Sequence, residues 1–282
     1  MLSKIITRKM HIKPIKMRWA TGGVNYSYLL STQDNRISWL IDPAESDEVE
    51  EALESTELDT VTTVANTHHH YDHSEGNLDM KKILSGKKIE IVAGSKVSPG
   101  ATIIPNHLDK FQLGSDIEIK CIRTPCHTQD SICYYVKDKT TNEQAVFTGD
   151  TLFTAGCGRF FEGDGNEMNI ALNETLLKGI DGIKNAKNVM VYPGHEYTKD
   201  NVKFVRKYVY TKIGENPALD QLEAFCEEHE MTTGRFTLED ELQFNPFMRL
   251  DDPLVRSAVK DENSNKIHAE VMTKLREMKN RG

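Results

Sequence analysis

Short apolar runs alternate with polar turn residues through the first two thirds of the chain. From Ile12 to Pro43 the pattern is extended, and the segments 24–30 and 38–42 predict strands of a meander. The acidic stretch 45–54 carries Val49, Ala52 and Leu53 at helical spacing. We therefore interpret its charges as the solvated face of a helix.

Four later apolar runs each lead into a histidine or an aspartate. The runs are 60–65, 117–123, 145–147 and 189–192, and they are followed by His68, His127, Asp150 and His195. Layered α/β proteins place their sites at the ends of strands. The pattern therefore predicts one site built from several strand ends.

Helical spacing dominates the last third of the chain. It predicts helices over 201–212, 218–229 and 266–279, after an earlier helix over 168–180. We expect an α+β fold with a catalytic domain over 12–197 and a helical C-terminal domain over 198–282.

Composition narrows the class of protein. Of the 282 residues 38% are hydrophobic, which is enough for a core, and the net charge of -8 argues against a general nucleic-acid binder. Five separate cysteines without a CxxC pair indicate neither a disulfide framework nor a thiolate zinc site. No apolar run approaches the roughly 20 residues that cross a bilayer. We expect a soluble monomer that binds no nucleic acid and no membrane.

The first residues are basic, and no acidic residue precedes Asp34. Leu2, Ile5 and Ile6 would share one helical face, with basic residues off it, which is typical of a mitochondrial presequence. The composition predicts a targeting segment over 1–11 and a place in the mitochondrial matrix. A frayed basic terminus is the alternative, and translation from Met10 would give a cytoplasmic form.

Candidate metal ligands gather after the run 60–65. His68, His70, Asp72 and His73 carry imidazole and carboxylate groups, which bind Zn, Fe or Mn. In an extended loop alternate side chains point the same way, so His68 and His70 can share one ion while His69 faces elsewhere. Four candidates within six positions argue against a chance His-rich surface loop.

Further ligands are expected from the other strand ends. Asp72 and His73 can hold a second ion beside the first, and His127, Asp150 and His195 complete the set. A carboxylate has one oxygen for each of two ions, which suits Asp150 to bridging.

The run from Thr67 to His73 resembles the THxHxDH motif of the metallo-β-lactamase superfamily. The resemblance implies an αβ/βα sandwich with the site at the edge of two sheets. It also implies how the ligands pair. One metal would be held by His68, His70 and His127, the second by Asp72, His73 and His195, and Asp150 would be shared.

Four further blocks resemble glyoxalase II, also called hydroxyacylglutathione hydrolase. They are 148–153, 155–163, 192–198 and 245–249, and the resemblance extends from about residue 12 to the C-terminus. It implies hydrolysis of S-(2-hydroxyacyl)glutathione, typically S-D-lactoylglutathione, to glutathione and D-lactate in methylglyoxal detoxification. The helical C-terminal region separates this family from lactamases and nucleases.

The same resemblance implies the glutathione contacts. The matching positions are Arg159, Phe160, Phe161, His195, Glu196, Tyr197, Arg276 and Lys279. Glutathione has two carboxylates and needs fixed cations, and Arg276 and Lys279 lie one helical turn apart. An ordinary solvated helix end is the alternative for these two residues.

Two positions depart from the pattern of the relatives. Phe161 stands where the family often has Tyr, and the lost hydroxyl removes a possible hydrogen bond of about 1 kcal/mol. Cys126 stands where many superfamily members have Gly, and we interpret it as a packed thiol rather than a nucleophile.

The expected chemistry follows from this set of residues. A hydroxide held between the ions would attack the thioester carbonyl, with Asp72 and Asp150 as the catalytic carboxylates. We expect two divalent ions, zinc first, with iron or manganese as alternatives. The leaving thiolate has a pKa of about 8.5, so no dedicated general acid is required.

Three alternatives are opposed by features of the chain. A glutathione persulfide dioxygenase shares the fold but uses one Fe(II) and lacks the helical region. A nuclease of the superfamily is opposed by the acidic charge. A non-catalytic metal-binding protein would hold metal without turnover, whereas every ligand of a working two-metal site is present.

Overall fold

The computed structural model describes residues 10–281, and the N-terminal strands build the first of its two five-stranded sheets. β1 (His11–Met17), β2 (Asn25–Ser31) and β3 (Ser38–Ile41) form an antiparallel meander. β4 (Val61–Ala65) and β5 (Glu90–Val92) continue the sheet as parallel strands. The extended pattern predicted between residues 12 and 43 is confirmed.

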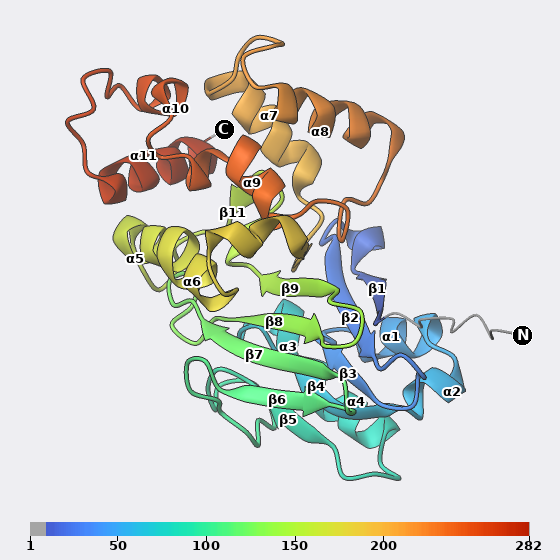
Figure 1. Cartoon of the computed structure of the whole chain (residues 1–282). Helices are drawn as coiled ribbons and strands as arrows, with labels where there is room; N and C mark the ends of the chain where they lie inside the picture. The colour runs from blue at the N-terminus through green and yellow to red at the C-terminus, as the bar shows by residue number, and fades with distance from the viewer. Residues whose placement is uncertain (1–9, 282) are drawn as a thin grey trace, which may run out of the picture.

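The second sheet has the order β12-β9-β8-β7-β6 (Figure 1). Its strands are β6 (Lys110–Leu113), β7 (Ile117–Arg123), β8 (Ile132–Asp138), β9 (Gln144–Gly149) and β12 (Val189–Pro193). β12 runs parallel to β9, and the other pairs are antiparallel. A two-stranded hairpin of β10 (Leu152–Phe153) and β11 (Gly156–Cys157) follows β9.

Apolar side chains from both sheets meet in the central core. Tyr28 and Trp39 of the first sheet pack with Ile119, Tyr134 and Phe147 of the second, and all five are buried. Because successive side chains of a strand point to opposite faces, each sheet also presents an apolar outer face.

Helices cover these outer faces. Val49 of α1 (Ser46–Ala52) and Met80 of α4 (Asn77–Ile83) pack on the first sheet, near α2 (Ser55–Leu58) and α3 (Tyr71–Ser74). Leu172 and Leu176 of the π-helical η2 (Ala171–Leu176) pack on the second sheet. The same helical segment contains α5 (Gly165–Ile170), α6 (Leu177–Gly179) and the 3-10 helix η3 (Ile183–Asn188). A short 3-10 turn, η1 (Trp19–Thr21), precedes β2. The layers form the predicted αβ/βα sandwich.

The chain after Tyr197 is helical, as predicted. It contains α7 (Thr198–Tyr208), α8 (Pro217–Glu228), α9 (Leu238–Phe244), the 3-10 turn η4 (Pro246–Met248), α10 (Pro253–Ala258) and α11 (His268–Arg281). The side chains of Asn216, Thr237 and Asp252 cap α8, α9 and α10 by accepting backbone N–H bonds. These helices share an apolar cluster with the helical layer of the second sheet. The domain boundary near residue 198 stays a prediction.

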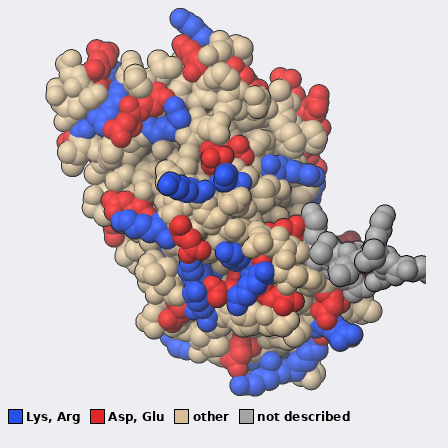
Figure 2. All heavy atoms as spheres, in the orientation of Figure 1, with Lys and Arg blue, Asp and Glu red and all other residues tan. Residues whose placement is uncertain are grey.

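The predicted targeting segment falls mostly outside the described residues, because the description begins at residue 10. His11 already pairs with Ser31 at the start of β1. Within residues 10–281 there is no helix of the length and apolar character that a membrane span requires. Acidic and basic side chains are interspersed over the face shown in Figure 2.

Candidate active site

The ends of four strands meet at one edge of the sandwich and deliver the predicted ligands. β4 leads through residues 66–70 into α3, and these segments carry His68, His70, Asp72 and His73. β7, β9 and β12 run in the same direction, so the residues that follow them also reach this edge. All seven predicted ligands lie together there: His68, His70, Asp72, His73, His127, Asp150 and His195.

Two groups of three ligands lie side by side. In the first, His70 Nδ1 is 3.1 Å from His68 Nε2 and 3.0 Å from His127 Nε2. In the second, which also contains Asp72, the Nε2 atoms of His73 and His195 are 3.2 Å apart. Each group has the composition that the resemblance implies.

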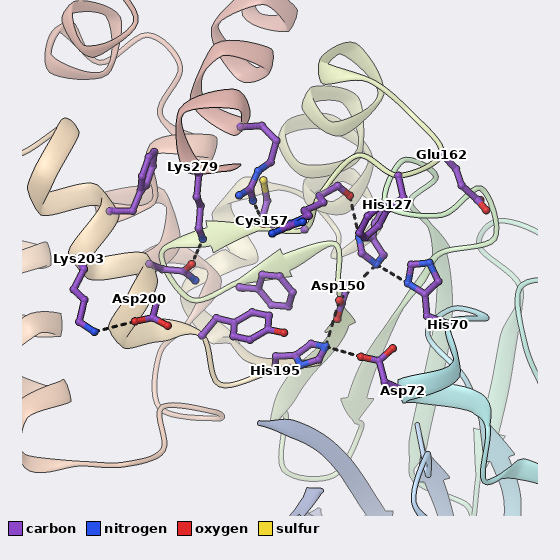
Figure 3. Close-up of a pocket in the computed structure, with 18 of the residues that line it drawn as sticks. His70, Asp72, His127, Asp150, Cys157, Glu162, His195, Asp200, Lys203 and Lys279 are labelled. Carbon is purple, nitrogen blue, oxygen red and sulfur yellow. Dashed lines mark hydrogen bonds and ion pairs between the residues drawn. The ribbon is translucent and has the colours of Figure 1, made fainter. Parts of the chain in front are cut away.

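Asp150 lies between the two groups. Its Oδ2 is 3.5 Å from His127 Nε2 and 3.4 Å from His195 Nε2 (Figure 3). Its buried Oδ1 makes no hydrogen bond among the described residues but lies 3.3 Å from His73 Nε2. Both carboxylate oxygens therefore face ring nitrogens of the cluster, which places Asp150 where it could serve both groups.

The outer ring nitrogens fix how these histidines point. His127 Nδ1 donates to the carbonyl of Arg159 at 2.9 Å, and His195 Nδ1 donates to the carbonyl of Gly23 at 3.0 Å. A neutral imidazole that donates from one nitrogen presents a lone pair on the other. Lone pairs that face one another at about 3 Å repel unless a cation lies between them. The donor set therefore fits divalent metal ions.

The electrostatics of the cluster agree with this fit. Burial lowers the pKa of His68, His70 and His127, which keeps these rings neutral and able to bind metal. Burial opposes ionisation of Asp150, but His195 and His73 hold its pKa well below the ordinary value. Neutral imidazoles beside an ionised carboxylate are the set that a divalent ion needs.

Positive charge is favoured on the His73 ring. Burial lowers its pKa, but the carboxylates of Asp150 and Asp42 outweigh burial and raise the pKa well above the ordinary value. The site therefore attracts a positive charge at this point, which a proton or a metal ion can supply.

Two neighbours of the cluster take no part in it. His69 Nδ1 lies 2.9 Å from Asp130 Oδ1, so this ring faces elsewhere, as predicted. Cys126 is buried, and burial raises the pKa of its thiol, which fits a packed residue rather than a nucleophile.

A cavity of about 960 Å³ opens beside the ligands. Six of the predicted glutathione contacts line it: Arg159, Phe161, His195, Tyr197, Arg276 and Lys279. Figure 3 shows Lys279 across the cavity from the labelled ligands His70, Asp72, His127, Asp150 and His195. The cavity thus joins a metal-binding wall to a cationic wall, and its volume suits a small molecule.

The lining residues are held by specific contacts. Arg276 is only 6% exposed and donates from Nη1 to the carbonyl of Cys157 at 2.9 Å, while Lys279 Nζ contacts Asn201 Oδ1. The Tyr197 ring stacks on His195 with a centroid separation of 4.5 Å. Phe161 is 60% exposed and contacts the edges of His70 and His127.

Comparison with known proteins identifies the family. The chain is 60% identical over 276 residues to the cytoplasmic isozyme of hydroxyacylglutathione hydrolase from Saccharomyces cerevisiae, which covers 96% of this chain and 100% of that protein. The chain belongs to the hydroxyacylglutathione hydrolase family. The mitochondrial hydroxyacylglutathione hydrolase of the same yeast is 57% identical, over 97% of this chain and 96% of its own length.

Two family models divide the sequence between them. The model for the metallo-beta-lactamase superfamily matches residues 20–195, and the model for the hydroxyacylglutathione hydrolase C-terminus matches 196–282. ETHE1 from Myxococcus xanthus shares the fold with a TM-score of 0.61 at 23% identity, covering 93% of this chain and 95% of that one. The chain is thus a hydroxyacylglutathione hydrolase relative built on the metallo-β-lactamase fold.

Two residues predicted to contact glutathione do not line the cavity. Phe160 packs against the apolar cluster beneath the second sheet. Glu196 accepts hydrogen bonds from the Tyr26 hydroxyl, Thr198 and the backbone N–H of Thr232. In this hydrolase the Glu196 carboxylate links β2 to the C-terminal helices instead of facing the cavity.

Sequence reasoning missed several residues of this site. Asp42 accepts from both the backbone N–H and the hydroxyl of Thr67, and its Oδ2 lies 3.1 Å from His73 Nδ1. It follows β3 as Asp150 follows β9, so the rule of strand ends would have found it. Lys203 and Lys207 also line the cavity. They lie on a helix, so the rule of strand ends could not have identified them.

Proposed function

We propose that this chain hydrolyses S-(2-hydroxyacyl)glutathione, with S-D-lactoylglutathione as substrate and glutathione and D-lactate as products, in methylglyoxal detoxification. One observation carries the proposal: a complete histidine and aspartate cluster opens into a cavity whose other wall holds Arg276 and Lys279. A thioester at one end and a carboxylate at the other are what this arrangement recognises.

We propose two divalent ions at the cluster, zinc first, with iron or manganese as alternatives. His68, His70 and His127 would hold one ion and Asp72, His73 and His195 the other, with Asp150 shared between them. When bound, such ions would lower the pKa of water to about 7 and polarise the carbonyl that is attacked.

The protein's own residues hold the ligands and orient the substrate. Asp72 is fixed by Asn25 Nδ2, which donates to the Asp72 carbonyl at 2.9 Å and contacts its Oδ2 at 3.2 Å. Arg276 and Lys279 bind the glycine carboxylate of glutathione, and the Phe161 ring shields the histidines beside the thioester. No general acid is assigned, because the leaving thiolate has a pKa of about 8.5.

Replacing the two cations tests the substrate site. Arg276→Ala with Lys279→Ala should raise KM for S-D-lactoylglutathione roughly 10-fold or more and change kcat much less, because hydrogen bonds to charged groups contribute about 1.5–3 kcal/mol. Lys274→Ala, on the same helix but outside the cavity, should leave both constants unchanged. An unchanged KM in the double variant would remove Arg276 and Lys279 from the site.

We further propose that the chain acts in the mitochondrial matrix, with a cytoplasmic form if translation starts at Met10. The basic, acid-poor composition of residues 1–9 supports the proposal. Fluorescent fusions of the full chain and of a chain starting at Met10 should separate into mitochondria and cytoplasm. Identical cytoplasmic signals from both would exclude a targeting role for these residues.

A further inference from the structure

The backbone of the β10–β11 hairpin is held by side chains of the C-terminal helical region. Every residue from Phe153 to Cys157 has one backbone group bonded in this way. The Ala155 N–H donates to Glu241 Oε2 at 3.0 Å, and Asn245 Nδ2 donates to the carbonyls of Phe153 and Gly156 at 3.4 and 3.0 Å. Asn201 Nδ2 and Arg276 Nη1 donate to the carbonyls of Thr154 and Cys157 at 2.8 and 2.9 Å.

The hairpin depends on these contacts for its shape. Its strands have two residues each, and an isolated two-stranded hairpin is marginally stable at best. Ala155, at its turn, has a φ of 57°, a left-handed conformation that a residue with a Cβ adopts at a cost. A Cβ on Gly156 would meet the Asn201 side chain at 2.7 to 2.9 Å, so the hairpin is also closely packed.

The same hairpin forms a wall of the cavity. Phe153 and Cys157 line it together with Arg276, Lys279 and Asn201. Because Arg276 donates to the Cys157 carbonyl and Lys279 contacts Asn201, the two cations and the hairpin take their positions from one another. Glu241 and Asn245 lie behind the hairpin, fully buried and outside the cavity lining.

We propose that Glu241 and Asn245 are positioning residues that hold the β10–β11 hairpin and so place Arg276 and Lys279 for the glutathione carboxylate. The inference rests on the proposed function. On this proposal the Asn245-Pro246-Phe247 segment contributes to the affinity for substrate and not to the chemistry at the metal ligands.

Glu241 performs this task as a neutral acid. Its Oε2 accepts from Ala155 N–H and from Asn245 Nδ2 at 2.9 Å, while its buried Oε1 has no hydrogen-bond partner among the described residues. Burial raises the pKa of Glu241 to about 8, the two hydrogen bonds lower it, and the charge of Asp240 adds to the rise. Protonation removes the negative charge from this buried carboxyl and so lowers the cost of its burial in an apolar surrounding.

Asn245→Ala is the first test, with Asn173→Ala as its matched control. Asn173 Nδ2 donates to the Phe247 carbonyl of the same segment at 3.1 Å, and within residues 10–281 no hydrogen bond joins its side chain to the hairpin. Asn245→Ala should raise KM for S-D-lactoylglutathione and Kd for the non-hydrolysable S-hexylglutathione about 10-fold, with kcat changed less than about twofold. Asn173→Ala should leave both affinities unchanged.

Glu241→Gln tests the neutral form. The amide keeps an acceptor for Ala155 and Asn245, so substrate affinity at pH 7 should match that of the unchanged protein. Glu241 holds its proton to about pH 8 in the folded chain but only to about 4.5 when unfolded, so its contribution to stability is lost as pH rises between these values. The Tm of the unchanged protein should therefore fall relative to that of Glu241→Gln across this range.

Each outcome decides one point. Wild-type affinity in Asn245→Ala, or equal losses in Asn245→Ala and Asn173→Ala, would overturn the positioning role. Parallel Tm curves for the protein and Glu241→Gln would overturn the neutral form of Glu241. Failure of the unchanged protein to bind S-hexylglutathione would instead count against the proposed function itself.

Discussion

Asp42 orients the histidine cluster without belonging to the predicted ligands. Its carboxylate receives two hydrogen bonds from Thr67 and faces His73 Nδ1 at 3.1 Å, so it fixes both the start of the ligand loop and the direction of one ring. A carboxylate behind a metal-binding histidine raises the basicity of the ring and sets its tautomer.

Asp42→Asn should therefore weaken metal binding roughly 10- to 100-fold, because an amide cannot accept from both Thr67 and His73 with the same charge. Competition with a chromogenic chelator measures the affinity directly. Asp34→Asn, in an exposed turn remote from the ligands, serves as the control. Metal affinity in Asp42→Asn equal to that of the control would refute the orienting role.

Lys279 predicts how substrate affinity depends on pH. Burial, with a smaller contribution from Arg276, lowers the pKa of Lys279 to about 7, so the ammonium loses its proton as pH rises through neutrality. KM for the thioester should rise between pH 7 and 8.5, by at most about tenfold per pH unit, while kcat changes by no more than about twofold as the metal-bound water completes its ionisation. Lys279→Arg stays charged and should remove the rise. A flat KM in the unchanged protein, or the same rise in the variant, would contradict this account.

The residues that sequence can predict are those whose chemistry is local. His68, His70, Asp72 and His73 stand within six positions, and a shared role is visible from that spacing alone. Asp42 contacts Thr67, which is 25 positions away in the sequence, and only the pairing of β3 with β4 brings the two residues together. Phe160 and Glu196 were predicted from a family pattern to contact glutathione. In the structure Phe160 packs against an apolar cluster and Glu196 accepts a hydrogen bond from the Tyr26 hydroxyl.

At the scale of elements, apolar runs that end in a histidine or an aspartate predicted the edge where the site lies. The prediction works because β7, β9 and β12 run in one direction, so their ends meet. β5, β6, β8 and the β10–β11 hairpin were not predicted; β8 is seven residues long and mostly buried, whereas the others have two to four residues each. Such short strands are specified by pairing with neighbours rather than by their own pattern.

The turn after β11 accepts only glycine at position 158. A Cβ there would meet the Asp150 carbonyl oxygen at 1.9 Å and His127 Nδ1 at 2.9 Å, so Gly158→Ala must displace two of the predicted ligands. We expect Gly158→Ala to bind fewer metal ions per chain and to lose activity at least 100-fold. Gly86→Ala, where a Cβ meets nothing within 4 Å, is the control. Full metal content measured by elemental analysis of Gly158→Ala would contradict the predicted displacement.

The whole molecule is acidic, yet it gathers cations around one cavity. The net charge is -8, while Arg159, Lys203, Lys207, Arg276 and Lys279 all line the cavity. These residues come from the turn after β11 and from α7 and α11, which are far apart in sequence. The cationic wall therefore cannot be predicted from the composition of the sequence. The family resemblance predicted three of its five residues, Arg159, Arg276 and Lys279.

Metal-dependent hydrolysis of a glutathione thioester is tested by following the thioester absorbance of S-D-lactoylglutathione with purified protein. Samples stripped by a chelator and reconstituted with zinc, iron or manganese are compared with Asp72→Ala. Turnover should disappear on stripping, return with metal and be lost in Asp72→Ala. A fully metallated protein without turnover would contradict this prediction and direct attention to persulfide oxidation or to a non-catalytic role.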